Sequence, residues 1–145
     1  MLTPDIVHLG AAPELLSPDD VAALKNNLPG MLLMRSVPVT GDESVEIAKS
    51  YDGIVDFLLL DSHRESDRQI GALGITHDWT ISRRIVELAR TPVILAGGLG
   101  PDNVAEAIRV VHPLVLIPKP KRTGAARMQR ILTTCGGSMR RLGAR

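Results

Sequence analysis

The sequence has few cysteines and few aromatic residues. Its 145 residues include one cysteine and one each of phenylalanine, tryptophan and tyrosine. The lone Cys135 excludes an internal disulfide framework and a cysteine-rich zinc site, so we expect a cytoplasmic protein. Three aromatic rings offer few stacking surfaces for single-stranded nucleic acid. No run approaches the roughly 18 consecutive apolar residues of a membrane helix, and the N-terminus has no basic stretch, so we expect neither a membrane partner nor export.

Acidic residues are missing from the last quarter of the chain. Residues 1–112 carry nine Lys and Arg against sixteen Asp and Glu, whereas residues 113–145 carry eight Lys and Arg and no acid. The formal charge of +1 therefore conceals a segment of net charge −7 followed by a segment of +8. We divide the chain at this point, into residues 1–112 and a basic tail, residues 113–145.

The first segment alternates between apolar runs and amphipathic stretches. Near-continuous apolar runs are typical of strands that are buried on both faces, as in a parallel sheet. These runs cover residues 6–9, 31–37, 54–60 and 92–96, with a weaker one at 115–117. The stretches between them begin with helix-start signals at Ser17-Pro18, Asp42, Asp78 and 100–103. The pattern predicts an α/β fold with a parallel sheet and four to five βα units.

One predicted strand ends at an acidic residue. Ligands of parallel α/β sheets bind at the carboxyl ends of the strands, and Asp61 follows the apolar run directly. A carboxyl group at this place is partly desolvated, which raises its pKa and suits it to general acid catalysis. The alternative is a helix-capping or loop acid that is hydrogen-bonded to the backbone.

A second predicted strand ends at Gly97 and Gly98. Glycines between a strand and a helix let backbone N–H groups approach a phosphate, although a tight turn with positive φ is the alternative. Between the two strand ends, a loop with Gly74 and His77 could close over a ligand. His77 suits proton transfer, and its alternative is a capping or packing role. No metal-ligand spacing or P-loop is present, so we expect no metal site.

Three strings of the sequence resemble one known family. "VDFLLLDS" (residues 55–62), "GALGITHDW" (71–79) and "PVILAGGLGPDNVAEAI" (92–108) are similar to motifs that occur in this order in phosphoribosylanthranilate isomerases. "DIVHLG" (5–10) fits less well. These isomerases are (β/α)8 barrels, and the resemblance covers the C-terminal half of the barrel and about three quarters of this chain. A complete barrel takes roughly 200 to 250 residues, so the resemblance implies a partial barrel.

The resemblance implies an Amadori rearrangement of N-(5-phosphoribosyl)anthranilate without a cofactor. Asp61 would protonate the ribose ring oxygen, Gly97 and Gly98 would hold the substrate phosphate, and Gly74 and His77 would contact the ligand from the loop. The family's base is a cysteine on the first strand, and this chain begins near the fourth strand. We therefore expect impaired catalysis in the chain alone, and a homodimer that covers the exposed sheet edges. A non-catalytic phosphate-binding remnant is the alternative.

The basic tail departs from the family pattern. Codons that fit residues 115–122 and 128–134, read in a shifted frame, yield acid-bearing strings with a strand start and a Lys-Asp pair. We therefore hypothesise a one-base frameshift near residues 113–114, which makes the tail a remnant of the last strand and helix. The alternative is a true basic tail that binds phosphate backbones, but it lacks aromatic residues and any nucleic-acid motif, so we do not expect a nucleic-acid partner.

Overall fold

The apolar runs of the sequence form the strands of one parallel sheet. A computed structural model describes residues 4–63 and 76–117. In this part of the chain the five strands pair in sequence order, β1-β2-β3-β4-β5, and every pair is parallel. The strands are β1 (Ile6–Leu9), β2 (Leu32–Pro38), β3 (Phe57–Asp61), β4 (Val93–Leu95) and β5 (Val115–Leu116). The helices are η1 (Pro13–Leu15), α1 (Pro18–Asn27), α2 (Glu43–Tyr51), α3 (Trp79–Leu88) and α4 (Val104–Val111).

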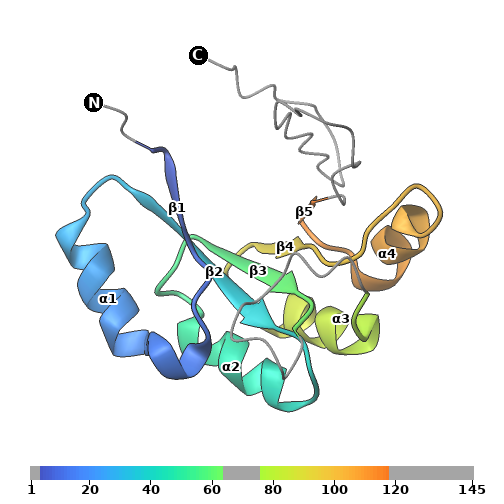
Figure 1. Cartoon of the computed structure of the whole chain (residues 1–145), viewed down its shortest axis with the longest axis horizontal. Helices are drawn as coiled ribbons and strands as arrows, with labels where there is room; N and C mark the ends of the chain where they lie inside the picture. Colours follow the sequence, from blue (N-terminus) through green and yellow to red (C-terminus); the bar gives the residue numbers. More distant parts are fainter. Residues whose placement is uncertain (1–3, 64–75, 118–145) are drawn as a thin grey trace.

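All four α-helices lie on one side of the sheet (Figure 1). Side chains alternate along each strand, so every second residue faces these helices. Leu33, Leu58 and Leu95 are among the strand residues that pack against the helices, and each is fully buried. This arrangement confirms the predicted α/β fold with alternating strands and helices. None of the helices in residues 4–63 and 76–117 is long and apolar enough to span a membrane.

The opposite face of the sheet carries a second, smaller apolar cluster. Its buried members are Met34, Leu59, Ile94, Ala96 and Val115. They come from four neighbouring strands or, for Ala96, from the residue that follows β4. Burial on both faces confirms the expectation that the apolar runs raised.

Helix α1 begins with reciprocal hydrogen bonds between Ser17 and Asp20. The Asp20 backbone N–H donates to Ser17 Oγ (3.2 Å), and the Ser17 backbone N–H donates to Asp20 Oδ2 (3.1 Å). The predicted cap at Asp78 is also present, because its carboxylate accepts from the Thr80 N–H (2.8 Å). Asp42 precedes α2 as predicted but makes no side-chain cap. Its carboxylate instead pairs with Arg84 of α3.

Strand β3 begins at Phe57, three residues later than the apolar run predicts. The backbone first turns at Gly53, whose φ is +80°. Asp56 then points to the neighbouring elements, where its carboxylate accepts from the Leu33 N–H (2.7 Å) and pairs with Lys25. Side-chain contacts at the strand entrance therefore displaced a boundary that hydrophobicity alone placed earlier.

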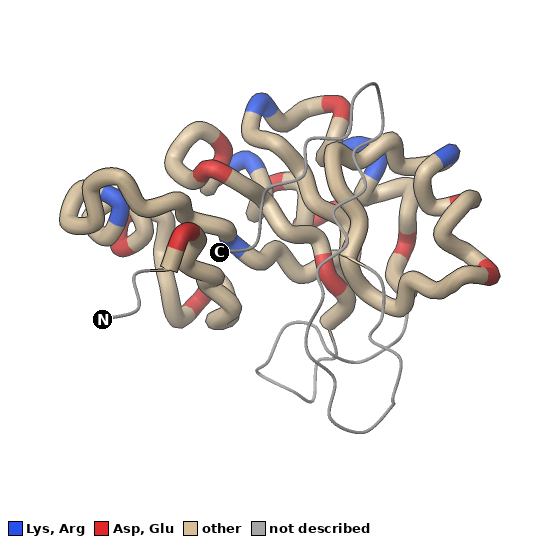
Figure 2. Tube along the Cα trace, turned by 90° about the horizontal axis from the view of Figure 1, so that it is seen from above, with Lys and Arg blue, Asp and Glu red and all other residues tan. Residues whose placement is uncertain are grey.

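The acidic residues of the described part of the chain are spread along it rather than gathered at one place (Figure 2). Several of them join neighbouring elements. Asp52, which follows α2, accepts hydrogen bonds from the backbone N–H groups of Arg90 and Thr91, just before β4. Residues 118–145, most of the basic tail, lie outside the described residues, whereas residues 113–117 are described and contain β5.

Candidate active site at the carboxyl ends of the strands

A diagonal row of polar residues crosses the second face of the sheet. His8 of β1, Ser36 of β2 and Asp61 of β3 share this face with Met34 and Leu59. His8 is opposite Met34, and Ser36 follows Met34 by two positions on β2. Ser36 in turn is opposite Leu59, and Asp61 follows Leu59 by two positions on β3. His8 Nε2 and Ser36 Oγ share a hydrogen bond of 2.6 Å. The face is therefore apolar at its centre and polar toward the carboxyl ends of the strands.

Asp61 is the last residue of β3 and its side chain is largely shielded from solvent. Its Oδ1 accepts from the Ser62 backbone N–H (2.8 Å) and from the Ser62 hydroxyl (3.4 Å). Burial raises the pKa of the carboxyl group, and this outweighs the lowering by the two Ser62 hydrogen bonds and by the charge of His8. The predicted direction of the shift is confirmed. The backbone contact to Ser62 also matches the alternative interpretation, but it engages one of the two carboxyl oxygens.

Gly97 and Gly98 form the turn that ends β4. Their φ angles are +87° and +64°, a left-handed backbone conformation that residues other than glycine rarely adopt. A Cβ atom on Gly97 would lie 2.9 Å from Asp61 Oδ1, 3.0 Å from the Ser62 nitrogen and 3.2 Å from His77 Nδ1. The turn thus needs glycine both for its backbone conformation and for the close approach of three neighbouring groups.

His77 lies beside this turn, just before α3. Its Nε2 shares a 2.8 Å hydrogen bond with the hydroxyl of Ser82, which is fully buried on α3. Burial lowers the pKa of His77 to about 4, against the opposite effect of the Asp78 carboxylate. The imidazole is therefore neutral at physiological pH, and its Nδ1 is buried with no hydrogen-bond partner among the described residues. The cap of α3 is Asp78 rather than His77.

Three of the residues singled out from the sequence thus come together: Asp61, His77 and Gly97. Gly74 lies outside the described residues. His8 and Ser36 were not expected at this site, although each is a polar residue within an otherwise apolar strand, which is a signal that could have found them. No group of three or more His, Cys, Asp or Glu in the described ranges could hold a metal ion.

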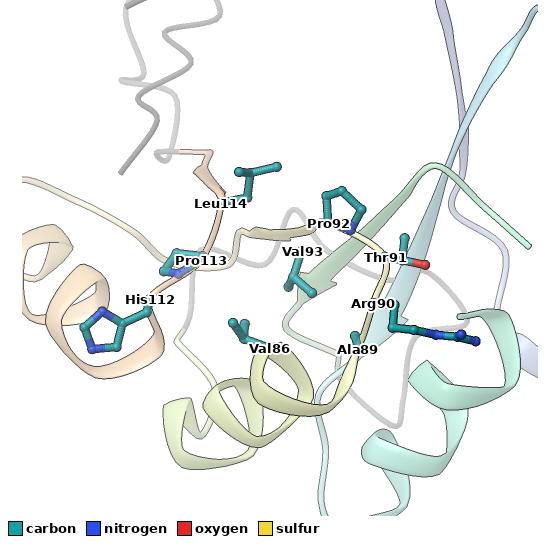
Figure 3. A pocket seen from close by; sticks show the side chains of 9 residues that line it. All are labelled: Val86, Ala89, Arg90, Thr91, Pro92, Val93, His112, Pro113 and Leu114. Carbon is teal, nitrogen blue, oxygen red and sulfur yellow. The ribbon is translucent and has the colours of Figure 1, made fainter. Parts of the chain in front are cut away.

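An open pocket lies at the other end of the sheet (Figure 3). Its volume is about 340 Å³, and its walls include Arg90, Pro92, His112 and Leu114, from the segments that lead into β4 and β5. In parallel α/β folds the amino ends of the strands support stability, whereas the carboxyl ends carry the chemistry. The candidate active site is therefore the group of residues around Asp61 and not this pocket.

Several known proteins are similar to this chain in sequence. The family model for N-(5'-phosphoribosyl)anthranilate (PRA) isomerase matches residues 21–116. An N-(5'-phosphoribosyl)anthranilate isomerase from Methanocella arvoryzae is 44% identical over 96 residues, which cover 66% of this chain and 44% of that protein. One from Methanosarcina acetivorans is 56% identical over 61 residues, covering 42% of this chain and 25% of that protein.

A solved structure is also similar to this chain. The phosphoribosyl anthranilate isomerase from Thermococcus kodakaraensis is 30% identical to this chain and superposes with a TM-score of 0.55. The match covers 77% of this chain and 51% of that one. These two matches, to the Methanocella and Thermococcus proteins, cover most of this chain but only about half of each relative.

Proposed function

Because the chain belongs to the N-(5'-phosphoribosyl)anthranilate isomerase family, we propose that it takes part in the Amadori rearrangement of tryptophan biosynthesis. The substrate is N-(5-phosphoribosyl)anthranilate and the product is 1-(2-carboxyphenylamino)-1-deoxyribulose 5-phosphate. The observation that carries the proposal is the position of Asp61, a carboxyl group with a raised pKa that lies against the Gly97 turn. We place this activity in the cytoplasm and assign it no cofactor.

Asp61 is the general acid of this proposal. It donates its proton to the ribose ring oxygen while the bond between that oxygen and C1 breaks, and the nitrogen lone pair forms the C1–N double bond of an iminium ion. Burial favours the protonated carboxyl group before the transfer. The Ser62 N–H stabilises the carboxylate afterwards. Loss of the C2 proton then gives an enol, which tautomerises to the ketone.

Gly97 and Gly98 hold the substrate phosphate in this proposal. Both precede α4, and backbone N–H groups at the N-terminus of a helix attract anions. The loop is braced by Asn103, whose amide donates to the Gly98 carbonyl (3.0 Å) and accepts from the Gly100 N–H (2.8 Å). His77 contacts the ligand from the side of α3. The base that removes the C2 proton belongs, by family resemblance, to a strand outside the matched segment.

Replacement of Asp61 by Asn tests the acid. We expect turnover to fall by about 10²- to 10⁴-fold, because the amide cannot donate the proton. Turnover is measured for the chain alone and together with a fragment that supplies the first half of the barrel. Asp102→Asn is the matched control, since Asp102 is an exposed acid of the loop before α4. Unchanged turnover in Asp61→Asn would exclude the assigned role.

A non-catalytic phosphate-binding protein is the second candidate. It is favoured by the left-handed turn at Gly97 and Gly98, which is present in this chain and needs no acid or base to hold a phosphate. This candidate predicts that inorganic phosphate binds to the chain and competes with the substrate while no product forms, with or without the first-half fragment. Product formation excludes it.

We also propose that two copies of the chain associate through their sheet edges. Among residues 4–63 and 76–117, β1 and β5 are the outer strands, and each pairs on one side only. Unpaired strand edges expose N–H and C=O groups that readily pair with another chain. Leu114 and Ile117 flank β5 and are 43% and 36% exposed, so this edge also has apolar surface to bury.

A further inference from the structure

His77 and Asp61 approach the same small space from different elements. A Cβ atom on Gly97 would lie 2.9 Å from Asp61 Oδ1 and 3.2 Å from His77 Nδ1. Asp61 comes from the end of β3, and His77 comes from the segment that leads into α3. A residue with a side chain at position 97 would hold the two groups apart, so the glycine permits their approach.

The contact with Ser82 determines which ring nitrogen of His77 carries the proton. Ser82 is fully buried on α3, and its hydroxyl is 2.8 Å from His77 Nε2. When the hydroxyl donates to Nε2, the proton of the neutral ring resides on Nδ1, on the side of Asp61. Nδ1 has no other hydrogen-bond partner among the described residues, and a buried N–H without a partner is costly. Asp61 Oδ1 is an acceptor on the same side, since it and His77 Nδ1 both lie within 3.2 Å of the position that a Cβ of residue 97 would occupy.

We propose that His77 is a positioning residue that donates a hydrogen bond from Nδ1 to Asp61 once that carboxyl group has given its proton to the substrate. This inference rests on the proposed function, because it assigns His77 a part in the same acid step. A neutral donor suits that part better than a cation. An imidazolium would lower the pKa of Asp61 and leave less of the carboxyl group protonated before the transfer, whereas a neutral N–H lowers that pKa less.

Two other titratable groups act on this pair. Asp78 lies next to His77 in the chain, and its charge favours the protonated imidazole, against the effect of burial. His8 of β1 acts on Asp61 from the other side and favours the carboxylate. Burial of His77 is the larger effect on its own pKa, so the imidazole beside Asp61 stays neutral.

The test replaces His77 by Phe, which keeps a ring, and by Asn, which keeps a hydrogen-bond donor near the position of Nδ1. Nitrogen-15 NMR of the full chain should show the Nδ1–H tautomer in the wild type. Carbon-13 NMR of Asp61 should show a higher titration midpoint in His77→Phe, because the donor to the carboxylate is lost, and a return toward the wild-type midpoint in His77→Asn. An Nε2–H tautomer, or an unchanged Asp61 midpoint in His77→Phe, would overturn the inference.

Kinetics separate this role from a purely structural one. With the first-half fragment present, His77→Phe should lower kcat about tenfold to a hundredfold, since the hydrogen bond forms only after proton transfer, and any change in KM reports the separate contact of His77 with the ligand. His77→Asn should recover most of the loss. A matching fall in a variant of the exposed His112, His112→Asn, would contradict the assignment. Should the wild type itself show no turnover, the proposed function fails, and the two NMR measurements still decide the inference.

Discussion

A single glycine, Gly97, lies between the residues of the candidate site and lets them approach one another. Gly97 and Gly30 both have left-handed backbones, with φ of +87° and +80°, but their surroundings differ. A Cβ on Gly97 would meet backbone and side-chain atoms within 3.2 Å, whereas a Cβ on Gly30 would have nothing within 4 Å. The pair therefore separates the cost of backbone strain from the cost of steric conflict.

Alanine at these two positions gives a first prediction. Gly30→Ala should lower the free energy of unfolding by about 1 kcal/mol, which is the usual cost of a left-handed alanine. Gly97→Ala should lower it by about 2 kcal/mol or more, because Asp61 and the Ser62 backbone must also move. Urea unfolding measures both values. Equal losses in the two variants would show that the groups around Gly97 yield without strain.

The buried His77 predicts a dependence of stability on pH. Its pKa is about 4 in the folded chain and about 6.5 when exposed, so unfolding takes up a proton between these values. Stability should therefore fall as the pH drops from about 6.5 to 4, by an amount on the order of 2–3 kcal/mol. The raised pKa of Asp61 acts in the opposite direction, since the folded state there binds the extra proton.

Urea unfolding at several pH values checks this prediction. The difference in stability between the wild type and His77→Phe should change by the same 2–3 kcal/mol across the range from about pH 6.5 to 4. His112→Asn, at an exposed position, should keep the wild-type pH dependence. A pH-independent difference between the wild type and His77→Phe would mean that folding leaves the pKa of His77 unchanged.

At the scale of the elements, the start of α1 can be tested with two serines. Ser17 caps the helix by reciprocal hydrogen bonds with Asp20, whereas the Ser50 hydroxyl donates to the Ile47 carbonyl (2.7 Å) on the exposed side of α2. Ser17→Ala should destabilise the chain by about 1 kcal/mol, because the Asp20 N–H loses its acceptor. Ser50→Ala should change stability by less than about 0.5 kcal/mol. Thermal unfolding compares the two, and similar losses would mean that the cap contributes nothing of its own.

The sequence predicted the elements better than their boundaries. Local signals mark the helices, so the starts after Ser17 and Asp78 were predicted from capping residues alone. The start of β3 depends on Asp56, whose partners Lys25 and Leu33 lie far away in the chain, and hydrophobicity carries no information about such contacts. The strand consequently begins later than predicted.

The candidate site divides in the same way. Asp61 and Gly97 were found because the end of a strand can be recognised locally, and parallel pairing brings the ends of β3 and β4 to one edge. The contact of His77 with Ser82 depends on how α3 is placed, and the row from His8 to Ser36 depends on the register of β1 against β2. Neither can be derived from spacing alone.

At the scale of the whole molecule, the sheet edges predict the oligomeric state. Light scattering after size-exclusion chromatography should give the mass of a dimer, since pairing would cover the edge of β5 and its exposed apolar neighbours. A double variant, Leu114→Lys with Ile117→Lys, should shift the chain toward the monomer. Leu88→Lys is the control, because Leu88 is 54% exposed on α3 and away from the edge. A monomer in the wild type would rule out this association.

One continuous stretch of the chain contains Asp61 and the residues that surround it. Asp61, His77, Ser82 and Gly97 all belong to the continuous segment that runs from β3 through α3 to β4. A single recombination event could therefore carry the acid, the imidazole, the serine and the glycine turn into another parallel scaffold. Catalytic constellations whose members lie on strands far apart in the chain cannot be inherited in this way. The segment from residue 57 to residue 98 is thus a transferable unit, and grafting it onto an unrelated half-barrel is a practical route to a new active site.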